Sequence, residues 1–239
     1  GSSGDLQWQK STNGGNTWTD VSSATSTTMT IQNMTTSASY RARLSSGVCP
    51  VLYTNILTIT VKQPTVAGTL TTAPSSICTG SASTLTLSGS SGTISWQKST
   101  DYNTPTPTWS AVAGNLSILS TGVLTTTTSY RAVLSNSPCP SSTTGSVVVT
   151  VSPKALAGIA SVNDAVGLLH CSGGDKTLKV SGSSGDLQWQ KSTNGGNTWS
   201  DVSSATSTTM TIQNMTTSAS YRARLSSGVC PVLYTNILS

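Results

Sequence analysis

Short stretches in which apolar and polar residues alternate recur along the whole chain. Leu85 and Leu87 alternate with polar neighbours in residues 83–88, and Trp96 lies on the apolar face of residues 93–99. Alternation with a period of two is the pattern of a half-buried β-strand. No segment shows a sustained helical period. The pattern therefore predicts a chain that is nearly all β.

The middle of the chain reads as about seven short strands separated by turn signals, which is typical of a β-sandwich and, alternatively, of a small barrel. The clearest strands are expected at residues 65–70, 83–88, 93–99, 129–136 and 146–152, with Pro74 and Cys78 in a turn segment after the first. Trp96 on the third strand and Tyr130 at the start of the sixth favour the sandwich. Immunoglobulin-like folds place a core tryptophan and a tyrosine corner at these positions.

The chain is a tandem array. Residues 1–58 return as residues 182–239, with only Thr19/Ser200 and Thr58/Ser239 different. A diverged relative lies between them, so the unit is about 90 residues long, which is enough for each unit to close its own core. We expect three immunoglobulin-like repeats. They are a partial repeat at residues 1–64 that begins at its third strand, a complete repeat at 65–154, and a repeat at 155–239 that lacks its last strand.

The joints between repeats contain no flexible spacer. Residues 60–64 run directly into 65–68, and residues 151–153 run directly into 154–158, with a proline at each joint. Proline fixes φ, and a short extended segment keeps neighbouring domains close together. The sequence therefore predicts a fairly rigid rod in which each repeat adds roughly 40 Å.

Cysteine positions predict disulfides and an oxidising environment. Cys78 and Cys139 are separated by 61 positions, and Cys171 and Cys230 repeat this arrangement. If the start of the second strand and the end of the sixth lie at the same pole, each pair forms a bridge within one repeat. Such a bridge would stabilise a repeat by roughly 4 kcal/mol in the chain-entropy model. Buried free thiols are the alternative, and Cys49 would have its partner before residue 1.

Composition argues against an enzyme, a cofactor and a metal site. Ser and Thr supply 86 of 239 residues, there is no Glu, and the chain has one His. Few groups remain for acid–base chemistry, and neither zinc nor calcium ligands are clustered. His170 beside Cys171 suggests a nucleophile only superficially, because adjacent strand residues point to opposite faces.

The charge pattern excludes a nucleic-acid surface. The net charge of +5 comes from 12 basic and 7 acidic residues spread thinly along the chain. There is no basic patch for nucleic acid and no apolar stretch long enough to cross a bilayer.

A second tryptophan follows the hairpin tip of every repeat, at Trp18, Trp109 and Trp199. The tip is Gly- and Asn-rich in the outer repeats and Pro-rich at residues 101–108 in the middle repeat. These three tryptophans are the repeated candidates for stacking on a glycan. The alternative is that the Trp-x-x-Val pattern closes the edge of each sandwich.

The chain resembles a known class of bacterial surface protein. The run Trp-Gln-Lys-Ser-Thr, the hairpin, the second Trp, then Thr-Ser-Tyr-Arg-Ala and a nearby Cys are similar to the immunoglobulin-like repeats of very large surface proteins of Bacteroidota. These proteins include gliding-motility adhesins of the SprB kind. The resemblance implies type IX secretion, an extracellular location on the cell surface and a long filament that serves attachment or gliding.

Three functions fit these observations. The first is a non-enzymatic adhesin shaft whose partners are its neighbouring repeats and, elsewhere in the protein, a polysaccharide or abiotic surface. The second is a glycan-binding array in which many weak sites add up. The third is a self-assembling fibre or sheath in which copies of the chain associate side by side or by strand donation.

Overall fold

A computed structural model of the chain describes residues 4–163 and 172–239, and every regular element in them is a β-strand. The chain divides into two compact units, which are treated separately. The first contains residues 1–64 together with 136–140, and the second contains residues 65–135 and 141–239. The prediction of an all-β chain is confirmed.

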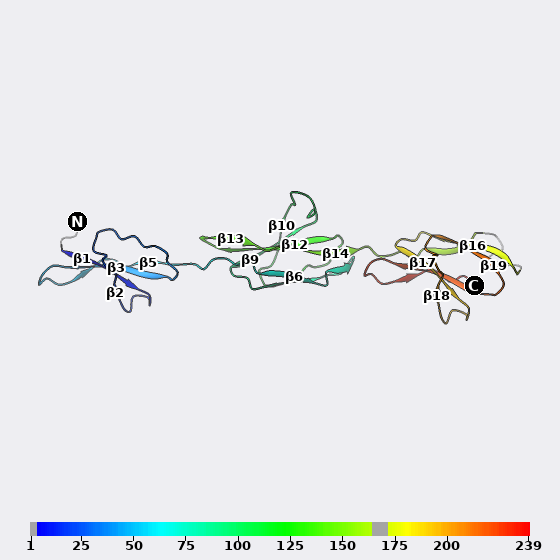
Figure 1. The fold of residues 1–239 in the computed structure, drawn as a ribbon, viewed down its shortest axis with the longest axis horizontal. Helices are drawn as coiled ribbons and strands as arrows, with labels where there is room; N and C mark the ends of the chain where they lie inside the picture. Colours follow the sequence, from blue (N-terminus) through cyan, green and yellow to red (C-terminus); the bar gives the residue numbers. More distant parts are fainter. Residues whose placement is uncertain (1–3, 164–171) are drawn as a thin grey trace. The chain divides into compact units, whose positions relative to one another are not determined.

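The middle repeat contains nine strands. They are β6 (Thr69–Ala73), β7 (Ser76–Cys78), β8 (Thr84–Ser88), β9 (Thr93–Ser99), β10 (Ser110–Val112), β11 (Ile118–Ser120), β12 (Thr128–Asn136), β13 (Cys139–Thr143) and β14 (Val147–Ser152). One sheet has the order β11-β8-β6, and the other has the order β10-β9-β12-β14-β7, with β13 paired to β12. The two sheets form the two layers that Figure 1 shows around β6 and β12. This is the arrangement of an immunoglobulin-like β-sandwich.

Alternation on both sheets explains the core between them. Leu85 and Leu87 point inward from β8, while Trp96 and Leu134 point inward from the facing sheet, and all four side chains are buried. The indole Nε1 of Trp96 donates a hydrogen bond to the carbonyl oxygen of Leu116 at 3.0 Å. The expected core tryptophan is therefore present, and its one polar atom has a partner, as a buried donor requires.

The last repeat builds a second sandwich with the same plan. Its strands are β15 (Ile159–Val162), β16 (Gly174–Ser181), β17 (Asp186–Ser192), β18 (Ser200–Asp201), β19 (Thr209–Met215), β20 (Ser220–Ser226) and β21 (Leu233–Tyr234). They form the sheets β15-β16-β19 and β18-β17-β20-β21. Trp189 takes the place of Trp96, and its Nε1 donates to the carbonyl oxygen of Ser207 at 3.0 Å.

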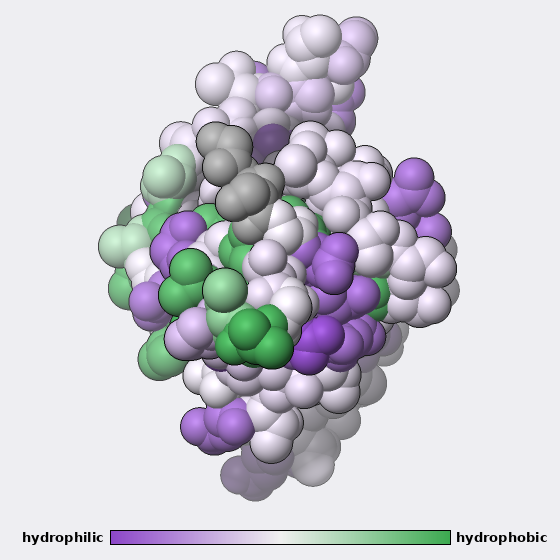
Figure 2. Space-filling model, turned by 90° about the vertical axis from the view of Figure 1, so that its left-hand side faces the viewer, coloured by the Kyte–Doolittle hydropathy of each residue, from purple (hydrophilic) through white to green (hydrophobic). Residues whose placement is uncertain are grey.

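The first unit is built around one sheet. Its strands are β1 (Asp5–Ser11), β2 (Thr19–Asp20), β3 (Ala38–Ser45), β4 (Leu52–Tyr53) and β5 (Leu57–Ile59), in the order β2-β1-β3-β4 with β5 also on β3. Ala38, Tyr40 and Ala42 are buried, but Leu57 and Ile59 stay exposed. Figure 2 shows the end of this unit, where hydrophobic side chains lie beside strongly polar ones.

Two strands were not expected from the sequence. The segment with Cys78 was predicted to be a turn, but β7 pairs in parallel with the last strand of the repeat, Ser152 opposite Cys78. Residues after β12 form the second arm of a hairpin, β13. The three residues of β7 are too few to show a period, and β13, Cys-Pro-Ser-Ser-Thr, has no alternation of apolar and polar residues.

The tyrosine corner was predicted wrongly. Tyr130 lies in β12 with 1% of its surface exposed, and its hydroxyl is buried with no hydrogen-bond partner among the residues that the structure describes. A tyrosine corner requires that hydroxyl to bond to the backbone upstream. Burial of this unpaired group raises the pKa of the Tyr130 hydroxyl. The ring therefore fills the core as a hydrophobic group, without the polar anchor.

We expect Tyr130→Phe to stabilise the middle repeat by roughly 1 kcal/mol, because it removes a buried hydroxyl that has no partner. Hydrogen exchange of the β12 amides measures the opening free energy of this repeat alone. As a matched core change, Trp96→Phe should destabilise by about 1–3 kcal/mol, because it removes the bond to Leu116 and leaves a cavity. A loss of more than about 1 kcal/mol for Tyr130→Phe would show that the hydroxyl has a partner.

Candidate functional site

The second unit contains a disulfide that links two repeats. Cys78, at the end of β7 in the middle repeat, is bonded to Cys230, in the turn after β20 of the last repeat, with a Cα–Cα distance of 4.8 Å. The two residues are 152 positions apart in the sequence. Cys49 and Cys139 carry free thiols.

The predicted pairing of Cys78 with Cys139 is therefore wrong. Strand β12 is antiparallel to β9, with Ser135 opposite Thr93, and β8 enters β9 through a short turn. Strands β8 and β12 must then run in the same direction. The start of β8 and the end of β12 lie at opposite poles of the sandwich, so Cys78 and Cys139 cannot meet. The other predicted bridge involved Cys171, which lies outside the described residues.

Contacts around Cys230 make the junction tight. The sulfur of Cys230 lies 3.4 Å from the carbonyl oxygens of Ser152 and Pro153. These are close contacts and not hydrogen bonds, because a disulfide sulfur has no proton. The oxygen of Ser152 accepts its hydrogen bond from the amide of Thr79 at 2.9 Å. The turn after β20 therefore rests on the last residues of the preceding repeat.

Gly228 permits this approach. A Cβ at this position would meet the Oγ and Cβ atoms of Ser152, and the residue has a φ of +49°, which disfavours other side chains. Glycine here allows the turn of the last repeat to touch the end of β14. The chain itself crosses the junction within two residues, because Ser152 still pairs with Cys78 and Ala155 is already buried in the core of the last repeat.

A second recurring feature lies on the exposed face of the sheet opposite the core. In each repeat an arginine on the long central strand stacks on the tryptophan after the hairpin. Arg41 lies 4.2 Å from the Trp18 ring centroid, Arg131 lies 4.1 Å from Trp109, and Arg222 lies 4.2 Å from Trp199. In the outer repeats a tyrosine covers the other side of the guanidinium, Tyr53 at 4.0 Å and Tyr234 at 3.9 Å. We refer to these stacks as the arginine ladder.

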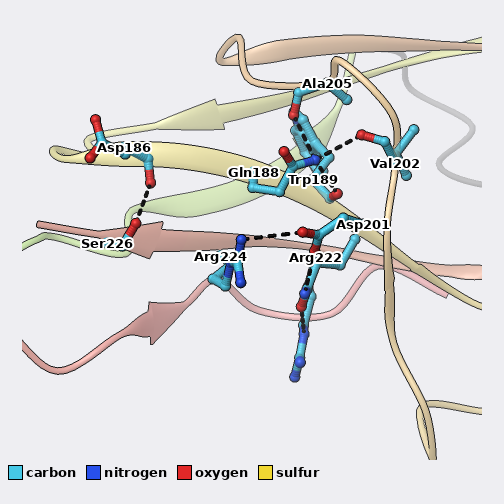
Figure 3. A network of polar contacts seen from close by, with 10 residues as sticks. Asp186, Gln188, Trp189, Asp201, Val202, Ala205, Arg222, Arg224 and Ser226 are labelled. Carbon is cyan, nitrogen blue, oxygen red and sulfur yellow. Dashed lines mark hydrogen bonds and ion pairs between the residues drawn. The ribbon is translucent and has the colours of Figure 1, made fainter.

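Cross-strand register extends the ladder into a polar network in the last repeat (Figure 3). Gln190 lies opposite both Arg222 and Asp201. It accepts from Arg222 Nε at 2.9 Å and donates to Asp201 Oδ1 at 2.8 Å, and the second oxygen of Asp201 pairs with Arg224 at 3.2 Å. Exposed ion pairs of this kind add little stability. Their value here is to fix the orientation of the stacked arginine.

The middle repeat keeps only part of this network. Gln97 accepts from Arg131 Nε at 2.8 Å, as in the outer repeats. Ala111 lies opposite Gln97, where the last repeat has Asp201, and Val133 replaces Arg224. Sequence analysis missed the ladder arginines, although their alternation in Tyr-Arg-Ala-Arg places them on the face opposite the core.

Each hairpin tip is held by one side chain. In the first repeat, Asn13 Oδ1 accepts from the Thr17 amide at 3.0 Å. In the middle repeat Asp101 does the same for the Thr108 amide at 3.0 Å and also accepts from Ser99 Oγ at 2.6 Å. The Ser99 hydrogen bond, followed by those from Thr108, lowers the pKa of the Asp101 carboxyl against the opposing effect of burial.

The candidate glycan residues Trp18, Trp109 and Trp199 are partly buried beside these tips. Each has an arginine over one ring face, so that face is closed to a sugar. In the outer repeats the indole Nε1 is also engaged, donating to Gly15 and Gly196 carbonyl oxygens at 2.9 Å. Glycan stacking on these rings stays a prediction.

Among residues 4–163 and 172–239, no cluster of three or more His, Cys or Asp side chains could hold a metal ion. The same residues contain no helix long and apolar enough to cross a membrane. His170 lies outside the described residues.

Fold and junction together define a protein of tandem immunoglobulin-like repeats. A family model described as a domain of unknown function (DUF8696) matches residues 1–63, 66–153 and 158–239. The chain belongs to this family. No curated protein matches the chain.

Several solved structures are similar to the chain at low identity. Titin domains A168–A170 align at 13% identity and a TM-score of 0.42, covering 84% of this chain and 72% of that one. Chicken CNTN1 FN1–FN3 domains align at 12% identity and a TM-score of 0.29, covering 98% and 89%. The human OSCAR ligand-binding domain aligns at 12% identity and a TM-score of 0.28, covering 73% and 97%.

We expect the middle hairpin alone to loosen in acid. The folded pKa of Asp101 is lowered, so the stability it contributes is complete at neutral pH and is lost as the pH falls through that pKa. The Thr108 amide resonance should shift when the pH is lowered below the ordinary pKa of an aspartate. In the last repeat Asn194 Oδ1 accepts from the Thr198 amide at 2.9 Å. Asn13 and Asn194 do not titrate, so the Thr17 and Thr198 amides serve as internal controls. A Thr108 shift that persists in Asp101→Asn would contradict this assignment.

Proposed function

We propose that this chain is a tension-bearing section of the shaft of a long, non-enzymatic adhesin filament on a bacterial cell surface. The observation that carries the proposal is the disulfide between Cys78 of one repeat and Cys230 of the next. A covalent link between neighbouring domains is of little use to a freely moving binding module. In a filament it changes the path along which force travels.

Tension that enters the middle repeat from its N-terminal side reaches Cys78 before it reaches most of the sandwich. Because Cys78 is bonded to Cys230, tension passes through the sulfur atoms and leaves toward the C-terminus. With this link taken alone, the 152-position segment between them carries no stretching force. In the middle repeat only the short β6 and β7 strands stay in the path, and in the last repeat only the residues after Cys230, with β21, do, so most of both cores is protected from mechanical unfolding.

An extracellular location on the cell surface is part of the proposal. Structural disulfides persist in oxidising compartments and are rare in the cytosol. Similarity of the repeat motifs to surface proteins of Bacteroidota supports type IX secretion and a role in attachment or gliding motility. The contacted surface, a polysaccharide or an abiotic material, would be bound by another part of the filament.

Stretching single molecules of the chain tests the mechanical claim. With the disulfide intact, the fully extended length should be about 500 Å shorter than after reduction, since roughly 3.3–3.6 Å per residue is hidden over 152 positions. The double variant Cys78→Ser, Cys230→Ser should behave like the reduced chain in either condition. Equal extension before and after reduction would contradict the proposal.

Cells that display the protein test the biological claim. Cells carrying the Cys78→Ser and Cys230→Ser changes should detach at lower shear than wild-type cells while displaying the same amount of protein. Val229→Ser is the matched control, because that side chain is exposed beside Cys230 and the change leaves the disulfide in place. If Trp199→Ala abolishes attachment with the fold intact, and the cysteine changes do not, the glycan-binding array is the better description.

A further inference from the structure

Three turns in the chain are equivalent, and they differ in how much covers their cysteine. Each follows the long central strand of its repeat and contains a Cys-Pro pair, at Cys49, Cys139 and Cys230. Cys49 is exposed, Cys139 is partly buried, and Cys230 is 7% exposed and disulfide-bonded. The turns with Cys49 and Cys230 have the same sequence, Ser-Ser-Gly-Val-Cys-Pro. The sequence of the turn therefore does not decide whether its cysteine is free or disulfide-bonded. Contact with a preceding repeat decides it.

Cys139 already occupies the position that Cys230 occupies at its own junction. Residues 136–140 belong to the same compact unit as residues 1–64. The Sγ atom of Cys139 lies 3.5 Å from the carbonyl oxygen of Lys62, the residue equivalent to Ser152. Asn136 Nδ2 also donates to the carbonyl oxygen of Gln63 at 2.8 Å. The turn is therefore docked on the end of the preceding repeat, as the turn with Cys230 is.

We infer that Cys139 is the downstream half of a second interrepeat disulfide. Its partner is the cysteine at the position equivalent to Cys78 in the repeat that precedes it. In the last repeat this position is Cys171. The first repeat corresponds to the last one at an offset of 181 positions, so its cysteine precedes Gly1 and is absent from residues 1–239. Every turn of this type thus bonds to the repeat before it, and no disulfide closes within a repeat.

The reaction is an ordinary thiol–disulfide exchange. The two thiols lose two protons and two electrons to an external disulfide, which is reduced to two thiols, while one new S–S bond forms. Oxidised glutathione serves as that disulfide in the test tube.

Two such links overlap along the chain. The loop closed by Cys139 would contain Cys78, and the loop closed by Cys78 and Cys230 contains Cys139. With both links in place, the middle repeat cannot be separated from the repeat on either side without breaking a disulfide. This inference concerns connectivity and holds whether or not the filament is an adhesin.

The test uses the full chain extended at its N-terminus by a second copy of residues 155–181. Apart from Thr19/Ser200 and Thr58/Ser239, that copy gives the first repeat the sequence of the last one, which folds in this structure. Cys171 in the last repeat is replaced by serine. Of the two tryptic peptides with the sequence of residues 155–176, only the copied one then contains a cysteine. The chain is refolded with reduced and oxidised glutathione, alkylated and digested with trypsin without reduction.

Trypsin separates the described cysteines, because Cys49, Cys78, Cys139 and Cys230 fall in peptides 44–62, 63–98, 132–154 and 225–239. We expect peptide 132–154 to be linked to the copied peptide 155–176, and 63–98 to be linked to 225–239. Alkylated Cys139 in peptide 132–154, or its linkage to 63–98, would overturn the inference.

A second measurement compares thiol reactivity, followed as the rate at which peptides 44–62 and 132–154 become alkylated. In the extended chain, Cys139 should react with iodoacetamide at least about tenfold more slowly than Cys49, because a sulfur in a disulfide offers no thiolate. When the copied cysteine is replaced by serine, the Cys139 rate should return to that of the original 239-residue chain. An equal Cys139 rate in both extended chains would show that no such bond forms.

Discussion

Strand polarity is the constraint on which the organisation of this chain depends. In the middle repeat, β8 and β12 run in the same direction, so Cys78 before the former and Cys139 after the latter lie at opposite poles. The chain also enters one pole and leaves from the other. A cysteine at the exit pole of one repeat therefore faces the entry pole of the next, and a bond such as Cys78–Cys230 follows.

The Cys78–Cys230 bond adds a covalent restraint to repeats whose hydrophobic cores are small. Each sandwich is built on a few buried groups, such as Trp96, Leu85 and Leu134 in the middle repeat. A repeat of this size has a free energy of unfolding of only several kcal/mol, and the work done by a stretching force along the chain can exceed it. In the proposed shaft, the disulfide would remove most of the chain from the line of tension, so that a small core would be sufficient. The close approach of Gly228 to Ser152 and the two-residue linker keep the sulfur atoms within bonding distance.

Most of the sandwich could be predicted from the sequence, because alternation marks strands with one buried face. Residues 93–99 and the buried Trp96 were found this way. The edge strand β7 was not found, because its three residues are too few to show a period and it pairs in parallel with β14. The disulfide was mispaired for a related reason. Spacing reports distance along the chain, whereas pairing depends on which pole each strand end reaches.

Comparison of the repeats within the chain separates what the architecture requires from what it tolerates. Both kinds of repeat keep the core tryptophan, the Gln–Arg–Trp stack and the cysteine of the turn. The middle repeat replaces Asp201 by Ala111, and the tyrosine that covers the guanidinium in the outer repeats is absent there. The retained residues orient the sheet face and join neighbours, while the lost ones are exposed ion-pair and ring contacts of small energetic value. Divergence has therefore removed these exposed contacts and spared the core tryptophan, the Gln–Arg–Trp stack and the cysteine of the turn.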